Sequence, residues 1–178
     1  KRAITLCKTP NGSGHQTFLS GIRVSFDLKY PCYISPELQR YHWIDIVTSA
    51  SKMHKLLQMD LDMACNEWVS QETIEKMRRL IDDYNSMLKS DSEFGIFYLR
   101  GGKVREAHSK REMLSFQFHK IISECPHGLE LFMRVSTNYL QLKTIYQQRK
   151  HHKLEFDWGA MCHFIEGLPY AKEFGLCD

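Results

Sequence analysis

The sequence predicts an α+β fold in which an antiparallel sheet packs with several helices. Residues 22–28 alternate apolar and polar side chains, as a half-buried strand does. Residues 74–88 and 114–122 repeat apolar side chains at steps of three or four, as amphipathic helices do. No repeat, linker or low-complexity tract divides the chain, so we expect residues 1–178 to form a single domain.

The first part of the chain predicts one strand followed by a mainly helical stretch. The strand covers residues 22–34, with Val24, Phe26 and Leu28 on one face, and Pro31 ends its regular pairing. Asn11 to Gly14 has the composition of a turn just before it. Residues 37–68 show a helical spacing of apolar side chains, although residues 45–51 are poor in helix formers and are expected to form a loop.

The second part of the chain predicts alternating helices and short strands. Ser70 is expected to cap a helix whose apolar stripe runs from Ile74 to Leu88. A strand at residues 94–100, a helix at 110–124 and a strand at 129–135 should follow, with Gly and Pro residues between them. Ser136 or Thr137 is expected to cap a helix that ends near residue 151, and a last helix covers residues 156–166.

The composition is that of a folded globular chain. Of the 178 residues 43% are hydrophobic and 12% aromatic, and the mean hydropathy is −0.41, which excludes a disordered or fibrous protein. No apolar run approaches the roughly 20 residues of a membrane span, so we expect no membrane helix. The first residues lack the apolar segment of a secretory signal, so we expect a cytoplasmic protein. The six cysteines form no Cys-x-x-Cys pair and are expected to be reduced.

Two segments are candidates for binding an anion, which must be local because the net charge is only +3. Residues 147–153 are the densest basic run, which suits either phosphate binding or a solvated last turn of a helix. Residues 39–54 gather imidazoles, an arginine, aromatic rings and hydroxyls, a mixture that suits a phosphorylated aromatic heterocycle. From composition alone, a helix-loop-helix corner explains this second segment better.

Metal binding and nucleophilic catalysis have weaker support. His151, His152, Cys162 and His163 are ligand types, but adjacent histidines point in different directions on a helix. The sequence has no His-x-x-x-His pair, no Gly-x-Ser-x-Gly motif and no phosphate loop of the Gly-x-x-x-x-Gly-Lys type. We therefore expect no metal site and assign no catalytic residue.

Several short motifs occur in an order that is characteristic of one family. They are Gly14-His15-Gln16-Thr17, the segment from Phe26 to Pro31, Arg40-Tyr41-His42, and Asn138-Tyr-Leu-Gln-Leu142 followed by Arg149. In this order and spacing they resemble the flavin-dependent thymidylate synthases, in which a Gly-His-x-Thr segment, an Arg-His-Arg motif and an Asn-x-x-x-Leu segment occur. The resemblance spans residues 10–154 and implies an α+β fold of that family.

The resemblance also implies functional positions. It places a flavin, FAD, beside His15, His42 and Asn138. It places a pyrimidine deoxynucleotide beside Arg40, Ser51 and Arg149, with Arg149 on the phosphate. Since sites in this family lie between subunits, it implies a homotetramer whose members complete one another's clefts.

The motifs also depart from the family pattern. Tyr41 stands where the family has the central His of Arg-His-Arg, and His42 stands where it has the second Arg. Glu37 replaces a Gln that contacts the pyrimidine, which reverses the charge character of that position. Leu140 and Thr144 fall where the family has an Arg and an Asn. The loss of cationic contacts should weaken the binding of a diphosphate cofactor.

Two hypotheses about function follow. In the first, the chain is an enzyme in which reduced FAD relays a one-carbon unit from a folate to carbon 5 of deoxyuridylate. In the second, the fold keeps a nucleotide-sized cleft without the flavin chemistry and acts as a binding or regulatory module for a nucleotide, a nucleic acid or a protein. Binding of a nucleotide is common to both hypotheses.

Overall fold

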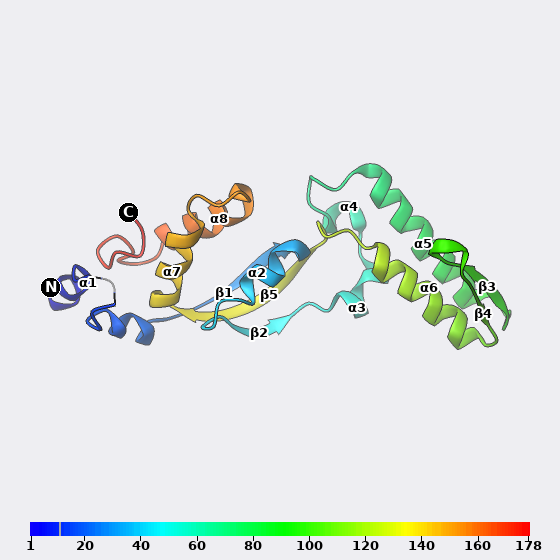
Figure 1. The fold of residues 1–178 in the computed structure, drawn as a ribbon, viewed down its shortest axis with the longest axis horizontal. Helices are drawn as coiled ribbons and strands as arrows, with labels where there is room; N and C mark the ends of the chain where they lie inside the picture. The colour runs from blue at the N-terminus through cyan, green and yellow to red at the C-terminus, as the bar shows by residue number, and fades with distance from the viewer. Residues whose placement is uncertain (11) are drawn as a thin grey trace. The chain divides into compact units, whose positions relative to one another are not determined.

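The computed structural model describes residues 1–10 and 12–178 and confirms the α+β class, with helices and antiparallel sheets (Figure 1). Asn11, part of the predicted turn, lies outside the described residues. The chain divides into two compact units, which we call the sheet unit (residues 1–50 and 132–178) and the hairpin unit (residues 51–131). The expectation of a single domain over residues 1–178 stays a prediction.

The sheet unit contains a three-stranded sheet and two longer helices. Its elements are α1 (Arg2–Cys7), a 3-10 helix η1 (Thr17–Gly21), β1 (Arg23–Pro31), a 3-10 helix η2 (Cys32–Ile34), α2 (Ser35–Leu38), β2 (Asp45–Ser49), most of β5 (Glu130–Asn138), α7 (Tyr139–Arg149) and α8 (Glu155–Glu166). The order in the sheet is β1-β5-β2. Strand β2 pairs antiparallel with β5, with Asp45 opposite Ser136 and Ser49 opposite Met133.

Strand β1 has the alternating burial that its sequence predicts. Val24, Phe26 and Leu28 are partly buried, and the residues between them are exposed. The Phe26 ring lies 4.5 Å from the ring of Phe164 in α8, so this face of β1 packs against that helix. Arg134 of β5 donates hydrogen bonds to Asp27 on the exposed face. Strand β1 is therefore covered by a helix on one side and carries ion pairs on the other.

The core of the sheet unit lies where α7 and α8 pack together. Leu142, Ile145 and Ile165 have no exposed surface, and Trp158 is 2% exposed. Asn138 caps α7, because its Oδ1 accepts a hydrogen bond from the Gln141 amide at 2.9 Å. Helix α7 is thus fixed at its start by a polar cap and along its length by apolar packing, and it carries the polar groups described below.

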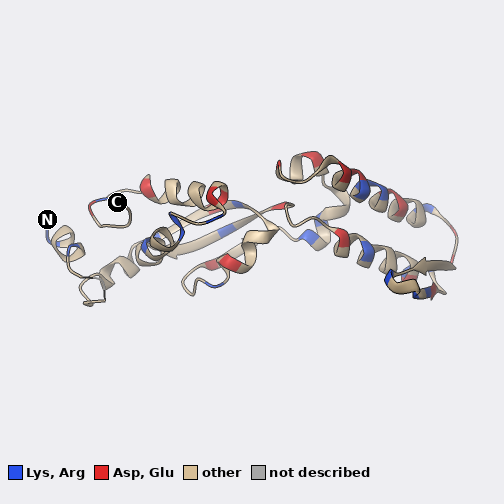
Figure 2. Cartoon of the chain, turned by 45° about the horizontal axis from the view of Figure 1, so that its top comes forward, with Lys and Arg blue, Asp and Glu red and all other residues tan. Residues whose placement is uncertain are grey.

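The hairpin unit packs two amphipathic helices with a two-stranded hairpin. Its elements are α3 (Lys52–Lys55), η3 (Leu56–Gln58), α4 (Leu61–Ala64), α5 (Gln71–Lys89), β3 (Gly95–Tyr98), η4 (Arg100–Gly102), β4 (Val104–Ala107) and α6 (Lys110–Glu124). Ser70 caps α5 as predicted, since its Oγ accepts from the Thr73 amide at 3.3 Å. Charges of both signs are interspersed along α5 and α6 (Figure 2), and Lys76 of α5 forms an ion pair with Glu124 of α6 at 2.5 Å.

Several sequence-based boundaries were wrong. Residues 45–51 do not form a loop within a helical stretch: Asp45–Ser49 is strand β2, whose Ile46, Val47 and Thr48 have the branched side chains that favour strands. The long helix expected at residues 37–68 is replaced by the short helices α2, α3, η3 and α4. The cap of α7 is Asn138 and not Ser136 or Thr137, because β5 continues to Asn138.

Within the described part of the chain, no helix is both long enough and apolar enough to cross a bilayer.

Candidate functional site

Arg149, at the end of α7, lies in a cluster of polar and aromatic side chains that we call the Arg149 cluster: Glu37, Tyr41, Arg149, His152 and Trp158. Its Nη1 donates to Glu37 Oε2 at 2.7 Å, and its Nε donates to the Tyr41 hydroxyl at 2.7 Å. The guanidinium carbon lies 4.2 Å from the centre of the Trp158 ring, so a cation–π contact covers one face of the group.

The charge of Arg149 is matched inside this cluster. Glu37 Oε2 also accepts from Trp158 Nε1 at 3.0 Å, and His152 Nε2 lies 3.7 Å from it. The side chains of Arg149 and Glu37 are only 14% and 26% exposed, so solvent screens the pair weakly. The carboxylate of Glu37 therefore occupies the position next to Arg149 that an anionic ligand would need.

A separate pocket of about 470 Å³ lies between η1 and the segment that precedes it on one side and α7 on the other. We call it the Lys143 pocket. Its lining residues are Gly12, Gly14, Gln16, Thr17, Leu140, Lys143, Thr144 and Gln147. It joins two of the segments that carry the family resemblance, the Gly14 to Thr17 motif and the start of α7. Its volume lies in the range of small-molecule sites, roughly 300–1,000 Å³.

Lys143 is a buried cation that, among the described residues, forms a side-chain hydrogen bond only with an amide. Its residue is 7% exposed, and Nζ donates to Gln16 Oε1 at 2.8 Å. The orientation of that amide is fixed, because Gln16 Nε2 donates to the carbonyl oxygens of Cys7 and Thr9 at 3.2 and 2.7 Å. Burial raises the pKa of the Cys7 thiol, so this thiol stays neutral and does not balance the charge. Among the described residues, no carboxylate forms an ion pair with Lys143.

None of the three predicted flavin-side residues is a lining residue of this pocket. His15 is exposed and lies between the lining residues Gly14 and Gln16. Asn138 is 3% exposed, and its Oδ1 is engaged as the cap of α7. His42 is exposed and packs edge-on against Trp43, with ring centres 4.9 Å apart. Asn138 and His42 do not line the Lys143 pocket.

The three predicted nucleotide-side residues have different local surroundings. Arg149 belongs to the cluster that contains Glu37. Arg40 is exposed, two residues after α2 ends at Leu38. Ser51 belongs to the hairpin unit, where it precedes α3 without a side-chain capping bond. None of these residues lines the Lys143 pocket.

Lys143 and Gln16 are the polar residues that the sequence analysis missed. The available signal was the position of Lys143 in α7, next to Leu142 and two residues before Ile145, within a run expected to face inward. A lysine in such a run is usually exposed or paired. A lysine that is buried without an acidic partner therefore indicates a binding site more strongly than the dense basic run at residues 147–153.

The lining residues fit a single phosphate group better than the diphosphate of FAD. Lys143 is the only cation among them, and Leu140 supplies no charge where the resemblance implies an arginine. Within the described residues, no group of three or more His, Cys, Asp and Glu side chains is placed to hold a metal ion.

Comparison with known proteins gives a likeness in structure alone. No family model and no curated protein matches the sequence. A crystal structure of flavin-dependent thymidylate synthase ThyX from Helicobacter pylori, complexed with FAD and dUMP, aligns with a TM-score of 0.61 and 14% identity over 98% of this chain and 81% of that chain. A second structure of ThyX from Helicobacter pylori with FAD and dUMP aligns with a TM-score of 0.61 and 13% identity, covering 98% of this chain and 80% of that one. At this identity, the likeness shows a shared fold.

Proposed function

We propose that this chain binds a pyrimidine deoxynucleotide such as dUMP in the Lys143 pocket, and that the ammonium group of Lys143 binds the phosphate. The observation that carries the proposal is the buried charge of Lys143, which the described residues leave without a carboxylate partner. Structural neighbours with this fold contain FAD and dUMP, which supports a nucleotide as the ligand class.

The electrostatics of the pocket favour an anion. Transferring an ammonium group from water into a protein without a counter-charge is costly, and a bound phosphate offsets that cost. Nζ of Lys143 has three N–H donors, and Gln16 accepts from it. Thr17 and Thr144 donate their hydroxyl hydrogens to the carbonyls of Gly14 and Leu140 and so can still accept a hydrogen bond from a ligand.

Two glycines of the pocket wall add no side chain to it. Gly12 and Gly14 have φ angles of +86° and +81°, a conformation that residues with a side chain rarely adopt, and among the described residues beyond their chain neighbours no atom lies within 4 Å of the place where a Cβ would stand. A ligand can therefore approach the backbone closely at this wall. Gln147, exposed on the α7 side, supplies an amide that can bond to a base or a phosphate.

Arg149, to which the resemblance assigns the phosphate, is a weaker candidate in this arrangement. Binding a phosphate there would require the displacement of Glu37 from two donors, Arg149 Nη1 and Trp158 Nε1. The phosphate would also meet the negative charge of that carboxylate. We therefore place the phosphate at Lys143.

Calorimetric titration with dUMP, and with deoxyuridine as the ligand without phosphate, tests this placement. We expect wild type to bind dUMP in preference to deoxyuridine. Lys143→Met keeps the length and burial of the side chain and should weaken dUMP binding by about tenfold to a hundredfold, the contribution of a charge-assisted bond. Lys143→Arg, which keeps the positive charge, should retain part of the affinity for dUMP that Lys143→Met loses. Arg149→Met, the matched control, should leave the affinity within about threefold of wild type, because its charge is already matched by Glu37.

The opposite pattern would contradict the placement. If Arg149→Met loses dUMP binding and Lys143→Met keeps it, the phosphate lies where the resemblance implies. If wild type binds neither ligand, the nucleotide proposal itself is wrong. Melting curves of each variant separate a loss of binding from a loss of folding.

The chemistry proposed for the site depends on whether FAD binds. Because Lys143 is the only cation in the pocket lining, we propose that the chain by itself acts as a nucleotide-binding module and not as a flavin- and folate-dependent enzyme. The absorbance spectrum of the purified protein and titration with FAD measure this directly: a stable flavin band would favour the thymidylate synthase reaction. Light scattering coupled to gel filtration would test the homotetramer that the resemblance implies.

A further inference from the structure

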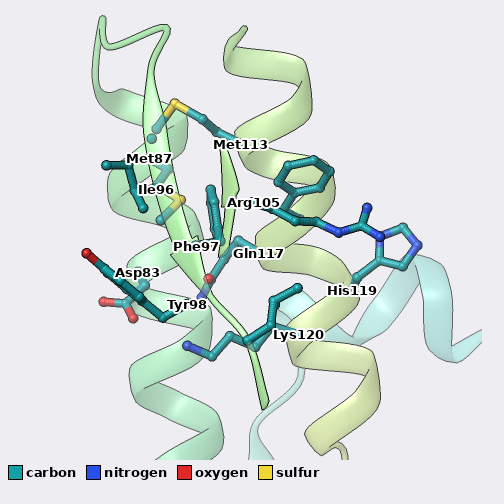
Figure 3. Close-up of a pocket in the computed structure, with 13 residues that line it drawn as sticks. Asp83, Met87, Ile96, Phe97, Tyr98, Arg105, Met113, Gln117, His119 and Lys120 are labelled. Carbon is teal, nitrogen blue, oxygen red and sulfur yellow. The ribbon is translucent and has the colours of Figure 1, made fainter. Parts of the chain in front are cut away.

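The hairpin unit contains a second pocket, of about 590 Å³, between the hairpin β3–β4 and helices α5 and α6 (Figure 3). We call it the hairpin pocket. All its lining residues fall between 83 and 120, so it belongs to the hairpin unit alone. Its volume is typical of a site for a small molecule, since such sites measure roughly 300–1,000 Å³.

The walls of the hairpin pocket are mainly apolar and aromatic. Helix α6 contributes Met113 and Phe116, which lie three residues apart and therefore share a face of the helix. The rings of Phe97 and Phe116 meet edge to face, with centres 5.5 Å apart and planes at 90°. Met87 of α5 and Ile96 of β3 lie close together at one side of the pocket in Figure 3. Such a surface suits a flat aromatic body.

Gln117 contributes a hydrogen-bond acceptor to the wall of the pocket. Gln117 is 2% exposed, and its Nε2 donates to the Leu80 carbonyl at 2.8 Å, which fixes the direction of the amide. Among the described residues, no donor reaches Gln117 Oε1. An amide oxygen is a hydrogen-bond acceptor, so Gln117 Oε1 can accept from an N–H or O–H group of a ligand in the pocket.

The rim of the hairpin pocket has more positive than negative charge. Arg105 and Lys120 are cations, Asp83 is the one acidic lining residue, and none of the three forms an ion pair with the described residues. The guanidinium of Arg105 lies 5.8 Å from the centre of the Phe116 ring, and its end points toward His119 in Figure 3. Nδ1 of His119 donates to the Ser115 carbonyl at 2.8 Å, which leaves Nε2 open to a ligand.

We propose that the hairpin pocket binds an aromatic small molecule that carries one acidic group and one N–H or O–H donor. The ring of the ligand packs against the wall formed by Phe97, Phe116 and Met113, the donor bonds to Gln117 Oε1, and the acidic group pairs with Arg105. Each group of the ligand thus matches one feature of the pocket: the ring matches the apolar wall, the donor matches the acceptor of Gln117, and the acidic group matches the cation of Arg105. The proposal is independent of nucleotide binding at Lys143, which lies in the sheet unit.

Two fluorescent probes that differ only in an acidic group measure how much that group contributes to binding. Anilinonaphthalene sulfonate has aromatic rings, an N–H donor and a sulfonate, and the matching phenylnaphthylamine has the same rings and N–H without the sulfonate. Both gain fluorescence in an apolar site. We expect saturable binding of the sulfonate to wild type, at least tenfold tighter than binding of the neutral analogue, since a bond to a charged group contributes about that factor.

Variants assign the binding to this pocket. Arg105→Gln should weaken sulfonate binding by about tenfold and leave the neutral analogue unchanged. Arg111→Gln is the matched control, since Arg111 is exposed on α6, does not line the pocket and carries the same charge. Asp83→Asn should strengthen sulfonate binding, because it removes the one acidic group from the rim. Gln117→Leu should weaken both probes, because both have the N–H group.

The proposal is overturned if Arg105→Gln and Arg111→Gln bind the sulfonate equally well. It is also overturned if the neutral analogue binds as tightly as the sulfonate, because the pocket then selects no acidic group. Should Gln117→Leu fail to fold, the surface variants Arg105→Gln and Asp83→Asn still decide the outcome. Unsaturable fluorescence in wild type would likewise show that no such site exists.

Discussion

Replacement of Glu37 by Gln should destabilise the sheet unit strongly, because it leaves the Arg149 charge unmatched. The carboxylate accepts hydrogen bonds from Arg149 Nη1 at 2.7 Å and Trp158 Nε1 at 3.0 Å. Removal of one member of a buried ion pair costs about 3–5 kcal/mol, and an exposed pair contributes about 1 kcal/mol or less. At 14% and 26% exposure the pair lies nearer to the buried case, and the new amide keeps one acceptor. We therefore expect a loss of about 2–3 kcal/mol in the free energy of unfolding.

Urea unfolding, followed by tryptophan fluorescence, measures this loss, since Trp158 is part of the cluster. The double variant Glu37→Gln with Arg149→Met completes a thermodynamic cycle. Because each single variant leaves a charged partner behind, the double variant should be more stable than the sum of the two losses implies, by about 1–2 kcal/mol. Positive coupling of this size would show that the two charges stabilise each other.

The control is Asp45→Asn, which removes an exposed ion pair with Arg23, where the side chains are 62% and 50% exposed. This change should cost less than about 1 kcal/mol. If Glu37→Gln costs no more than Asp45→Asn, or if the cycle shows no coupling, then solvent screens Arg149. In that case Glu37 does not neutralise the charge of Arg149, and Arg149 is free to bind an anion.

Other changes test local features of both units. Glu166 accepts a hydrogen bond from Tyr146 and raises the pKa of Tyr146 to about 12. Since an unfolded tyrosine ionises near pH 10, the stability from this bond is complete below about pH 10 and is lost as the pH rises to about 12; urea unfolding of Tyr146→Phe should show a shallower decline over that range. In melting experiments, Gly128→Ala should lower the free energy of unfolding by about 1–3 kcal/mol, because the Cβ of the new alanine would stand 2.6 Å from Asn66 Oδ1. Gly159→Ala in α8 should raise the free energy of unfolding by up to about 1 kcal/mol, because alanine favours a helix more than glycine does and the new Cβ would have no described atom beyond its neighbours within 4 Å.

Local patterns predicted the longer elements of the fold well. Helix α6 has the bounds Lys110–Glu124 that the sequence analysis expected, and Ser70 caps α5. Both depend on side chains close in sequence, a periodic apolar stripe and a cap within three residues. Strand β2 was not predicted, because residues 45–49 are exposed along their length and show no alternation. Its pairing with β5, some ninety residues later in the chain, determines its conformation, and no local signal contains that pairing.

The candidate site was less predictable than the fold. The sequence shows that Glu37 reverses the charge of a family position, but no local pattern indicates that this carboxylate contacts Arg149, 112 residues later in the chain. The fixed orientation of Gln16, which decides what Lys143 can bind, depends on backbone carbonyls of Cys7 and Thr9. A sequence gives the type of a side chain, whereas its electrostatic role depends on which atoms the fold brings within hydrogen-bond distance.

Helix α7 has two cations whose electrostatic surroundings differ in a way that the sequence does not show. Arg149 belongs to a dense basic run and matches a family motif, yet Glu37 and two aromatic rings enclose it. Lys143 lies between the inward-facing Leu142 and Ile145, and among the described residues its ammonium group donates a hydrogen bond only to the amide of Gln16. A cation that already pairs with a carboxylate gains little from a second anion. A buried cation without such a partner gains more, so we expect Lys143 to bind an anion more strongly than Arg149 does. Our proposal therefore weighs the charges around each cation above the local density of basic residues, and the titrations of the Lys143 and Arg149 variants test that choice.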